Sequence, residues 1–177
     1  RRLMTTNLLK RLESSVCSFR LTLERVLAAM SAALETIDDY RRGLASGASV
    51  ADGDLPGGFD FDPDDESGFE VGGATKILVE DMDWMSWERD IEADVAVIEV
   101  LISMVRDIDP AHDAKLIELC EQIREKSQGP INPGNRKVLV FTAFSDTADY
   151  LYENVSAFAK RELGLECAKV TGDGCAC

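Results

Sequence analysis

Between Leu8 and Tyr40, apolar side chains recur at steps of three and four residues for more than 30 residues. Such steps return a side chain to the same face of an α-helix, so the stripe is typical of an amphipathic helix. Hydroxyl and amide side chains at residues 5–7 precede the stripe and Gly43 follows it, which are the usual start and stop signals. The sequence therefore predicts a long helix, or a helical hairpin, over residues 1–42.

Acidic side chains are concentrated in the middle of the chain. The formal net charge is −14, and residues 43–135 hold 22 acidic but only 6 basic side chains. Residues 43–75 have no basic side chain and are interrupted by glycines and prolines, which favours an acidic flexible loop over residues 43–82. A solvated linker, a partner-binding segment and a calcium loop all remain open, although the carboxylate spacing of an EF-hand is absent. Because this charge repels phosphates, we expect the chain alone to bind nucleic acid poorly at physiological salt.

Two further helices are predicted within an insertion at residues 83–128. After Asp83, a second helical stripe runs through Trp84, Trp87, Ile91, Val95, Ile98, Ile102 and Val105. Asp109 is positioned to cap a following helix that has Pro110 in its first turn and continues to Lys126. Its buried side would hold Leu116, Cys120 and Ile123. The single histidine, His112, falls in the first turn of that helix, where we expect a surface residue without a catalytic role.

The period changes after a linker at residues 129–136. Val138, Leu139, Val140 and Phe141 form an uninterrupted apolar run, which is typical of a strand covered on both faces. Ser145 or Asp146 is positioned to cap a helix that would bury Ala148, Leu151, Val155 and Phe158 and end at Gly164. The run "LECAKV" then supplies a second strand, which completes one right-handed βαβ unit. The predicted fold class is α/β, with long helices and an acidic loop followed by this incomplete unit. Its open strand edges would be covered by helices or by another copy of the chain.

The loop "TAFSDT" would lie at the carboxyl end of the first strand, where open α/β sheets bind ligands. Thr142, Ser145 and Thr147 would place hydroxyls beside the free amides of a helix N-terminus, a combination that suits a phosphate. Hydroxyl residues are also common at any helix start, so a purely structural role is equally supported. Gly129 and Gly134 have the spacing of a Walker A loop, but Asn135 replaces its lysine.

Neither a complete ATP site nor a metal site is favoured by the sequence. No acidic run at the end of an apolar strand supplies a magnesium site. Cys17, Cys120 and Cys167 sit singly in apolar surroundings, which is typical of small buried residues in a reducing compartment. Cys175 and Cys177 form a C-x-C pair, but a chain with one histidine and no second cysteine pair offers little support for zinc.

Two stretches carry a resemblance to a known family. The stretch "KLIELCEQIREKSQGPINPGNRKVLVFTAFSDTADYLYENV", followed by "GLECAKVTGDG", resembles the opening of the second RecA-like domain of superfamily-two helicases, particularly the bacterial Swi/Snf-type translocases. The stretch "LLKRLESSVCSFRLTLERV" resembles an inter-lobe helix of the same proteins. Residues 1–30 and 115–174 are covered, while residues 43–110 look like a family-variable insertion. Residues 137–177 would then be the start of the helicase C-terminal, RecA-like domain.

The resemblance implies a function for the parent protein. Residues Thr142, Ala143 and Phe144 would lie beside the bound nucleic-acid strand, with Ser145 and Thr147 in the same loop, and Thr171 and Gly172 would approach its backbone at a later turn. Such contacts position a strand and do not read its sequence. The parent would hydrolyse ATP with magnesium and move along nucleic acid, with DNA favoured, together with the remaining helicase lobes. This chain lacks the phosphate-loop lysine, the acidic box and the arginine finger, so we expect it to hold no cofactor and to be inactive alone.

Two other functions remain open. An acidic helical protein-interaction module without enzymatic activity is the main alternative, and a nucleotide-binding enzyme of another type is less supported because glycine-rich phosphate loops are missing. No apolar run approaches the roughly 20 residues that cross a bilayer, and no secretory signal pattern is present, so we expect a cytoplasmic protein without membrane contact. The chain begins with Arg1 and stops soon after an apolar run, so we expect it to be a fragment of a longer protein.

Overall fold

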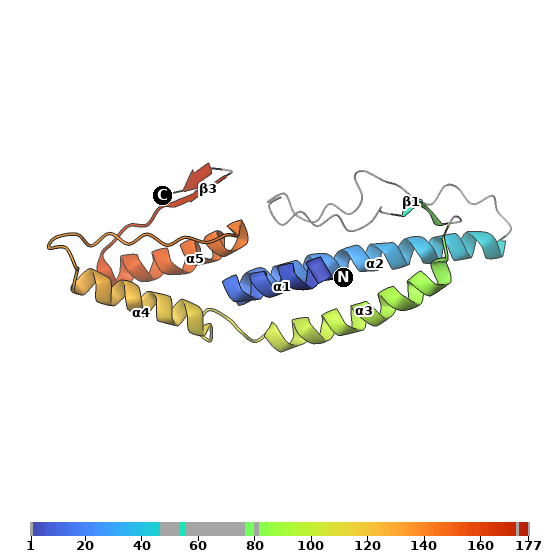
Figure 1. Ribbon diagram of the computed structural model, residues 1–177, viewed down its shortest axis with the longest axis horizontal. Coiled ribbons are helices and arrows are strands. Elements are labelled where there is room, and N and C mark those ends of the chain that lie inside the picture. Colours follow the sequence, from blue (N-terminus) through green and yellow to red (C-terminus); the bar gives the residue numbers. More distant parts are fainter. Residues whose placement is uncertain (1, 47–53, 56–76, 80–81, 173, 177) are drawn as a thin grey trace. The chain divides into compact units, whose positions relative to one another are not determined.

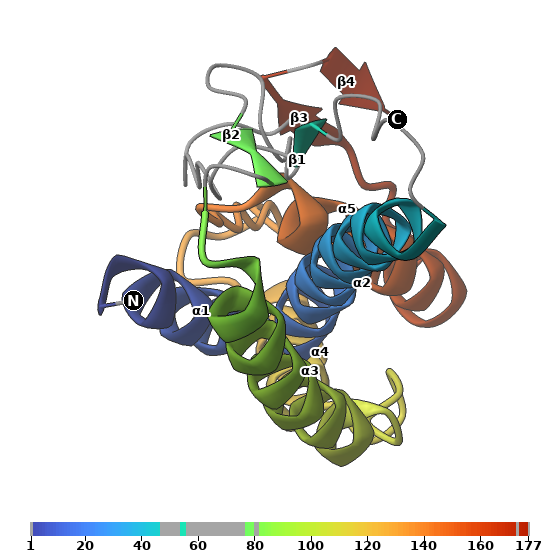
Figure 2. The ribbon, with the colours of Figure 1, turned by 90° about the vertical axis from the view of Figure 1, so that its right-hand side faces the viewer.

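The computed structural model describes residues 2–46, 54–55, 77–79, 82–172 and 174–176 (Figure 1). The predicted acidic loop at 43–82 therefore lies mostly outside the described residues. The chain divides into two compact units, one formed by Arg1–Arg20 with Arg106–Cys177 and the other by Leu21–Val105. The described residues are mostly helical, with two short antiparallel ribbons (Figure 2).

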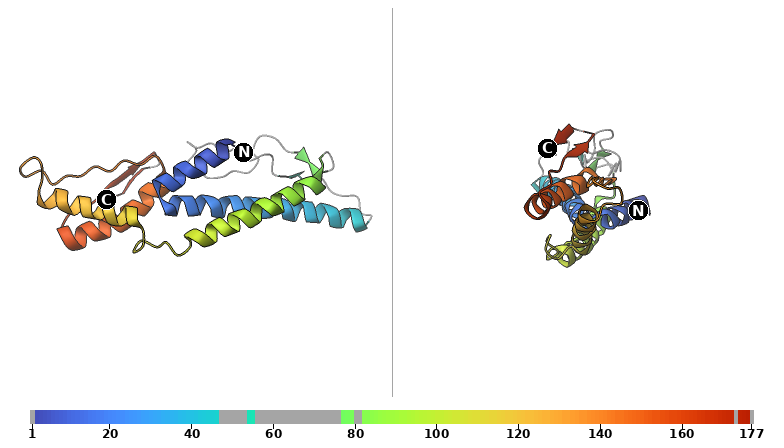
Figure 3. Two further views of the ribbon diagram at one scale, coloured as in Figure 1. Left: turned by 60° about the horizontal axis from the view of Figure 1, so that its bottom comes forward. Right: turned by 90° about the vertical axis from the view of Figure 1, so that its left-hand side faces the viewer.

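The first unit is mostly helical and has a small apolar core between α4 and α5. It contains α1 (Arg2–Ser14), the first residues of α2 (Val16–Ser46), α4 (Ala114–Gln128), α5 (Ser145–Phe158) and the π-helical turn η2 (Ala159–Leu163). Helices α4 and α5 lie side by side (Figure 3). Their shared core is formed by Ile123, Phe158 and Ala159, with half-buried Leu119, Cys120, Val155, Leu163, Leu165 and Cys167 packed against it.

The second unit pairs α2, from Leu21 onward, with α3 (Trp84–Val105), and the two helices run in opposite directions (Figures 1 and 3). Tyr40 meets Trp84 edge to face at 6.2 Å between ring centroids, and Arg41 forms an ion pair with Glu88. The short strands β1 (Asp54–Leu55) and β2 (Ile77–Leu78) pair antiparallel. The buried apolar side chains of this unit are Leu23, Val26, Met30, Ala33, Ile37, Val79, Ile91, Ile98, Ile102 and Val105.

The residues of the long N-terminal stripe form two helices, because the helical conformation is interrupted at Ser15. The Ser15 hydroxyl accepts a hydrogen bond from the backbone N–H of Ser18 at 2.9 Å, which is the geometry of a helix N-cap. The backbone of Ser15 still donates to the Arg11 carbonyl at 2.9 Å, so the break is local. Helix α2 continues for 31 residues beyond it.

The predicted helix after Asp83 is confirmed as α3, but the predicted start of the next helix is wrong. Helix α4 begins at Ala114 because the carboxylate of Asp113 accepts hydrogen bonds from the backbone N–H groups of Lys115 and Leu116. Asp109 instead closes the preceding turn, where it accepts from Ala111 and His112. His112 is exposed, as expected. Asp113, which lies nearer the apolar stripe than Asp109, is therefore the residue that caps α4.

The predicted βαβ unit is not formed in the described part of the chain. Residues 138–141 belong to no strand or helix, and Leu139 and Phe141 are 83% and 89% exposed instead of buried. Strand β3 (Lys169–Thr171) pairs antiparallel with β4 (Gly174–Ala176). A strand buried at residues 138–141 would need partner strands on both edges. Strand β3 pairs with β4 instead, so it does not serve as such a partner.

The cap predicted for α5 is also wrong. The N-cap position is Phe144, without a side-chain cap, and neither Ser145 nor Asp146 fills that role. The predicted stop at Gly164 is confirmed, since this residue follows η2 with a left-handed φ of 63°, which glycine adopts without strain. Among the described helices, none has the length and apolarity needed to cross a bilayer.

Candidate functional site

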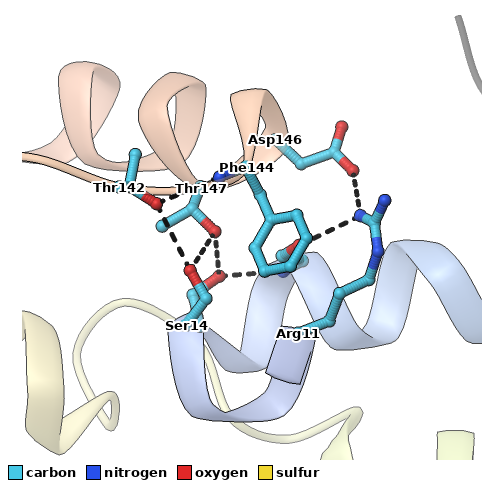
Figure 4. A network of polar contacts seen from close by, with 8 residues as sticks. Arg11, Ser14, Thr142, Phe144, Asp146 and Thr147 are labelled. Carbon is cyan, nitrogen blue, oxygen red and sulfur yellow. Dashed lines mark hydrogen bonds and ion pairs between the residues drawn. The ribbon is translucent and has the colours of Figure 1, made fainter. Parts of the chain in front are cut away.

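The predicted loop at residues 142–147 meets the break between α1 and α2 (Figure 4). The Thr147 hydroxyl lies 2.9 Å from the Ser14 hydroxyl and 3.4 Å from the Ser15 hydroxyl. The Thr142 hydroxyl lies 3.3 Å from the Ser14 hydroxyl. We call Ser14, Ser15, Thr142 and Thr147 the hydroxyl cluster. It links two segments that are more than 120 residues apart in sequence.

Arg11 adds an ion pair and a cation–π contact beside the hydroxyl cluster. Nη1 of Arg11 donates to the carboxylate of Asp146 at 3.1 Å and to the Ser18 hydroxyl at 3.4 Å. Its guanidinium lies over the Phe144 ring, 4.7 Å from the centroid. The Arg11 and Asp146 side chains are only 11% and 17% exposed, so water screens this ion pair weakly. Asp146 also lies in the first turn of α5, where the helix dipole favours a negative charge.

We call the hydroxyl cluster together with Arg11, Phe144 and Asp146 the junction. Helix α4 supports it from another side, because Nζ of Lys115 donates to the carbonyl oxygens of Leu12 and Glu13. These carbonyls belong to the last turn of α1, where no intrahelical partner is available. The break between the helices is therefore stabilised by a cation from α4, by the Thr142 hydroxyl from the loop before α5 and by the Thr147 hydroxyl from the first turn of α5.

A second, partly buried contact joins the N-cap of α4 to α5. The Tyr150 hydroxyl donates to Asp113 at 3.0 Å, and the same carboxylate caps α4. Burial, and then the hydrogen bond and negative charge of Asp113, raise the pKa of Tyr150 above its ordinary value of 10.0. Burial also raises the pKa of the nearby Cys17 thiol, which disfavours the reactive thiolate.

The structure brings only some of the predicted site residues together. Thr142, Phe144 and Thr147 belong to the junction, while Ala143 is exposed and Ser145 is half-buried in the first turn of α5. Thr171 lies in β3 and Gly172 in the turn that follows, where the Thr171 hydroxyl donates to the Gly174 carbonyl at 3.4 Å. Within the described residues, no hydrogen bond joins Thr171 or Gly172 to the junction.

The hydroxyl cluster has limited capacity to bind an anion in this arrangement. A hydroxyl offers one donor, and the three contacts within the cluster use three of its four hydroxyl protons. A phosphate needs donors, so its binding by Thr142 or Thr147 stays a prediction that requires these hydroxyls to rotate. In the part of the chain that the structure describes, no three His, Cys, Asp or Glu side chains gather as metal ligands.

Sequence reasoning missed Arg11, Ser14, Asp113, Lys115 and Tyr150. One signal was available, because two adjacent serines, at 14 and 15, lie inside the predicted helix, and such small polar pairs often accompany a helix break. The partners of these residues lie far away along the chain, and no local pattern identifies such partners. Comparison with protein-family models, curated proteins and solved structures finds no match to this chain.

Proposed function

We propose that this chain is the part of an ATP-dependent nucleic-acid translocase that joins the helices between two RecA-like lobes to the beginning of the second lobe. One observation carries the proposal. The two stretches that resemble this family are separated by more than 80 residues, yet residues 1–20 and 106–177 form one compact unit. The intervening residues 21–105, most of which lack the resemblance, form the other unit.

In this proposal the junction fixes the start of the second lobe to the helices that precede it. A motor of this kind must transmit the movement of one lobe to the other, so the loop beside the nucleic acid needs a firm attachment. The weakly screened pair of Arg11 and Asp146 and the hydroxyl cluster provide that attachment. Thr142, Ala143 and Phe144 keep their proposed contact with the nucleic-acid backbone, and the catalytic groups belong to the rest of the parent protein.

The test compares this chain with the product of the uninterrupted reading frame that encodes it. We expect the longer protein to hydrolyse ATP with magnesium and to do so faster when duplex DNA is added, whereas the 177-residue chain does neither. Arg11→Met in the longer protein should reduce the stimulation by DNA several-fold. Arg42→Met, which removes two exposed ion pairs of α2, is the matched control and should leave the stimulation by DNA unchanged. A reading frame without a phosphate-binding loop, or a product without ATP hydrolysis, would overturn the proposal.

A protein-interaction module is the second candidate function. It is favoured by exposed apolar side chains on the acidic helix α3, and these side chains lead to the inference below, which does not rest on the translocase proposal.

A further inference from the structure

Helix α3 carries two apolar stripes on different faces. Ile91, Ile98, Ile102 and Val105 form the buried stripe. Ala93, Val97, Val100 and Met104 recur at steps of four, three and four residues on another face, and we call them the outer stripe. All four are exposed, with Val97 at 59%, Val100 at 57% and Met104 at 70%. A helix with two apolar faces buries both only when two partners pack against it. The described part of the chain packs against one of these faces.

The spacing of the outer stripe indicates what shape of partner fits it. Steps of four and three repeat the pattern of a coiled-coil seam, in which the side chains of one helix insert between those of a second helix. The stripe extends over about three turns of helix, or about 17 Å at a rise of 1.5 Å per residue. A single helix laid along α3 would therefore cover Ala93 to Met104 completely, and branched Val97 and Val100 present the narrow ridge that such packing uses.

The charges beside the outer stripe indicate the sign of that partner. Asp90 and Asp94 follow one side of the stripe, and Glu92 and Glu99 lie on the other side. Arg89 is the one basic residue of α3, and it pairs with Asp90 at 3.6 Å. In the described part of the chain, Glu92, Asp94 and Glu99 are exposed and no basic side chain forms an ion pair with them. A second copy of this chain would bring like charges together, whereas a basic partner would neutralise them.

From these observations we infer that the outer stripe of α3 is a docking surface for a basic amphipathic helix of another protein. Leucine-like side chains of that helix contact Val97, Val100 and Met104, and its lysine or arginine side chains reach Asp94 and Glu92. The apolar contact supplies most of the affinity, and the charges select the partner and speed the encounter. This surface is separate from the junction, so its loss would leave the translocase proposal unaffected.

The test uses two synthetic helical peptides of about 20 residues, long enough to hold a helix in water. Both carry the same leucine seam, but one has lysine and the other glutamate beside it. We expect the lysine peptide to bind the 177-residue chain at least about tenfold more tightly than the glutamate peptide at low salt. This ratio should fall as salt is added, because salt screens exposed charges. Equal binding of the two peptides would overturn the inference.

Variants of the chain locate the binding site. Val97→Gln with Met104→Gln should weaken binding of the lysine peptide about tenfold, and Glu92→Gln with Asp94→Asn should weaken it several-fold at low salt only. Leu9→Gln with Ile117→Gln is the matched control, because it removes exposed apolar side chains from α1 and α4 and should leave binding unchanged. Glutamine is a good helix former, so circular dichroism should show unchanged helix content in the Val97 and Met104 variant.

Two further results would contradict the inference. One is unchanged binding of the lysine peptide by the Val97 and Met104 variant. The other is sedimentation of the chain alone as a dimer that this variant dissociates, since a second copy would then be the occupant of the outer stripe.

Discussion

At the scale of single residues, the junction depends on Arg11, which holds together groups from three segments. It pairs with Asp146, contacts the Ser18 hydroxyl and covers the Phe144 ring. A weakly screened charge that loses its partner costs more than the pair itself contributes, because the remaining charge stays desolvated. The two exposed ion pairs of Arg42 with Asp38 and Asp39 are the natural comparison, since water and salt screen them strongly.

Replacing Arg11 with methionine should therefore destabilise the first unit by about 1.5–3 kcal/mol, since the Asp146 carboxylate is largely buried and loses its charged hydrogen bond from Arg11. Urea denaturation followed by circular dichroism measures this loss. Arg42→Met is the control and should cost less than about 0.5 kcal/mol. Adding Asp146→Asn to Arg11→Met should recover part of the loss, and a double variant less stable than the single one would show that the two residues do not act as a pair.

Tyr150 makes the stability of the first unit sensitive to alkaline pH. Its pKa is raised in the folded chain by burial and by Asp113, so the folded state holds the phenol proton more tightly than the unfolded state. The resulting stability is fully present below the unfolded pKa of 10.0 and is lost as pH rises above it. Tyr150→Phe should cost about 1 kcal/mol at neutral pH, the usual net value of one hydrogen bond.

The same variant should lose stability less steeply above pH 10 than the parent chain does. Tyrosinate absorbance against pH is the second measurement, and it should lack one late-titrating tyrosine in Tyr150→Phe. An unchanged absorbance titration would mean that Tyr150 is not the shielded phenol.

At the scale of elements, the structure differs most clearly from the sequence-based prediction at residues 138–141. A strand covered on both faces would bury Leu139, so a charge at that position would cost several kcal/mol. In the structure the side chain is exposed, and Leu139→Lys should change the free energy of unfolding by less than about 0.5 kcal/mol. Ile123→Ala, in the core between α4 and α5, should instead cost about 2–4 kcal/mol.

Denaturant titration of both variants decides between these expectations. Leu139→Lys should also raise the solubility of the chain, because it interrupts a short apolar run of high β-propensity. A loss of several kcal/mol on Leu139→Lys would indicate that residues 138–141 are covered in solution.

Elements that depend only on residues close together in the sequence could be predicted from it. The apolar period places α3, and a left-handed glycine ends the segment at Gly164. The break at Ser15 and the cap at Asp113 depend on which of several polar residues meets a distant partner, so the pattern alone does not select them. Strand pairing is also a long-range property. The apolar run at 138–141 therefore favours a strand locally but does not identify the strands that would pair with it.

At the scale of the whole molecule, the chain has two units with separate apolar cores. Both tryptophans, Trp84 and Trp87, lie in the second unit, close to the contact of Trp84 with Tyr40. Tryptophan fluorescence therefore reports the unfolding of that unit alone, whereas circular dichroism reports the helices of both units. The two signals together can show whether the units unfold as one.

We expect them to unfold separately, because each unit buries its own set of side chains, although the chain passes between them twice, within α2 and directly after α3. Ile123→Ala, which damages only the first unit, should shift part of the circular dichroism transition to lower urea by an amount equivalent to about 2–4 kcal/mol. The fluorescence transition should stay where it is in the parent chain. Ile98→Ala is the reciprocal variant, since it damages the core of the second unit and should shift the fluorescence transition instead. If either variant moved both transitions together, the chain would be one cooperative unit, and the junction would then stabilise α3 as well as the first unit.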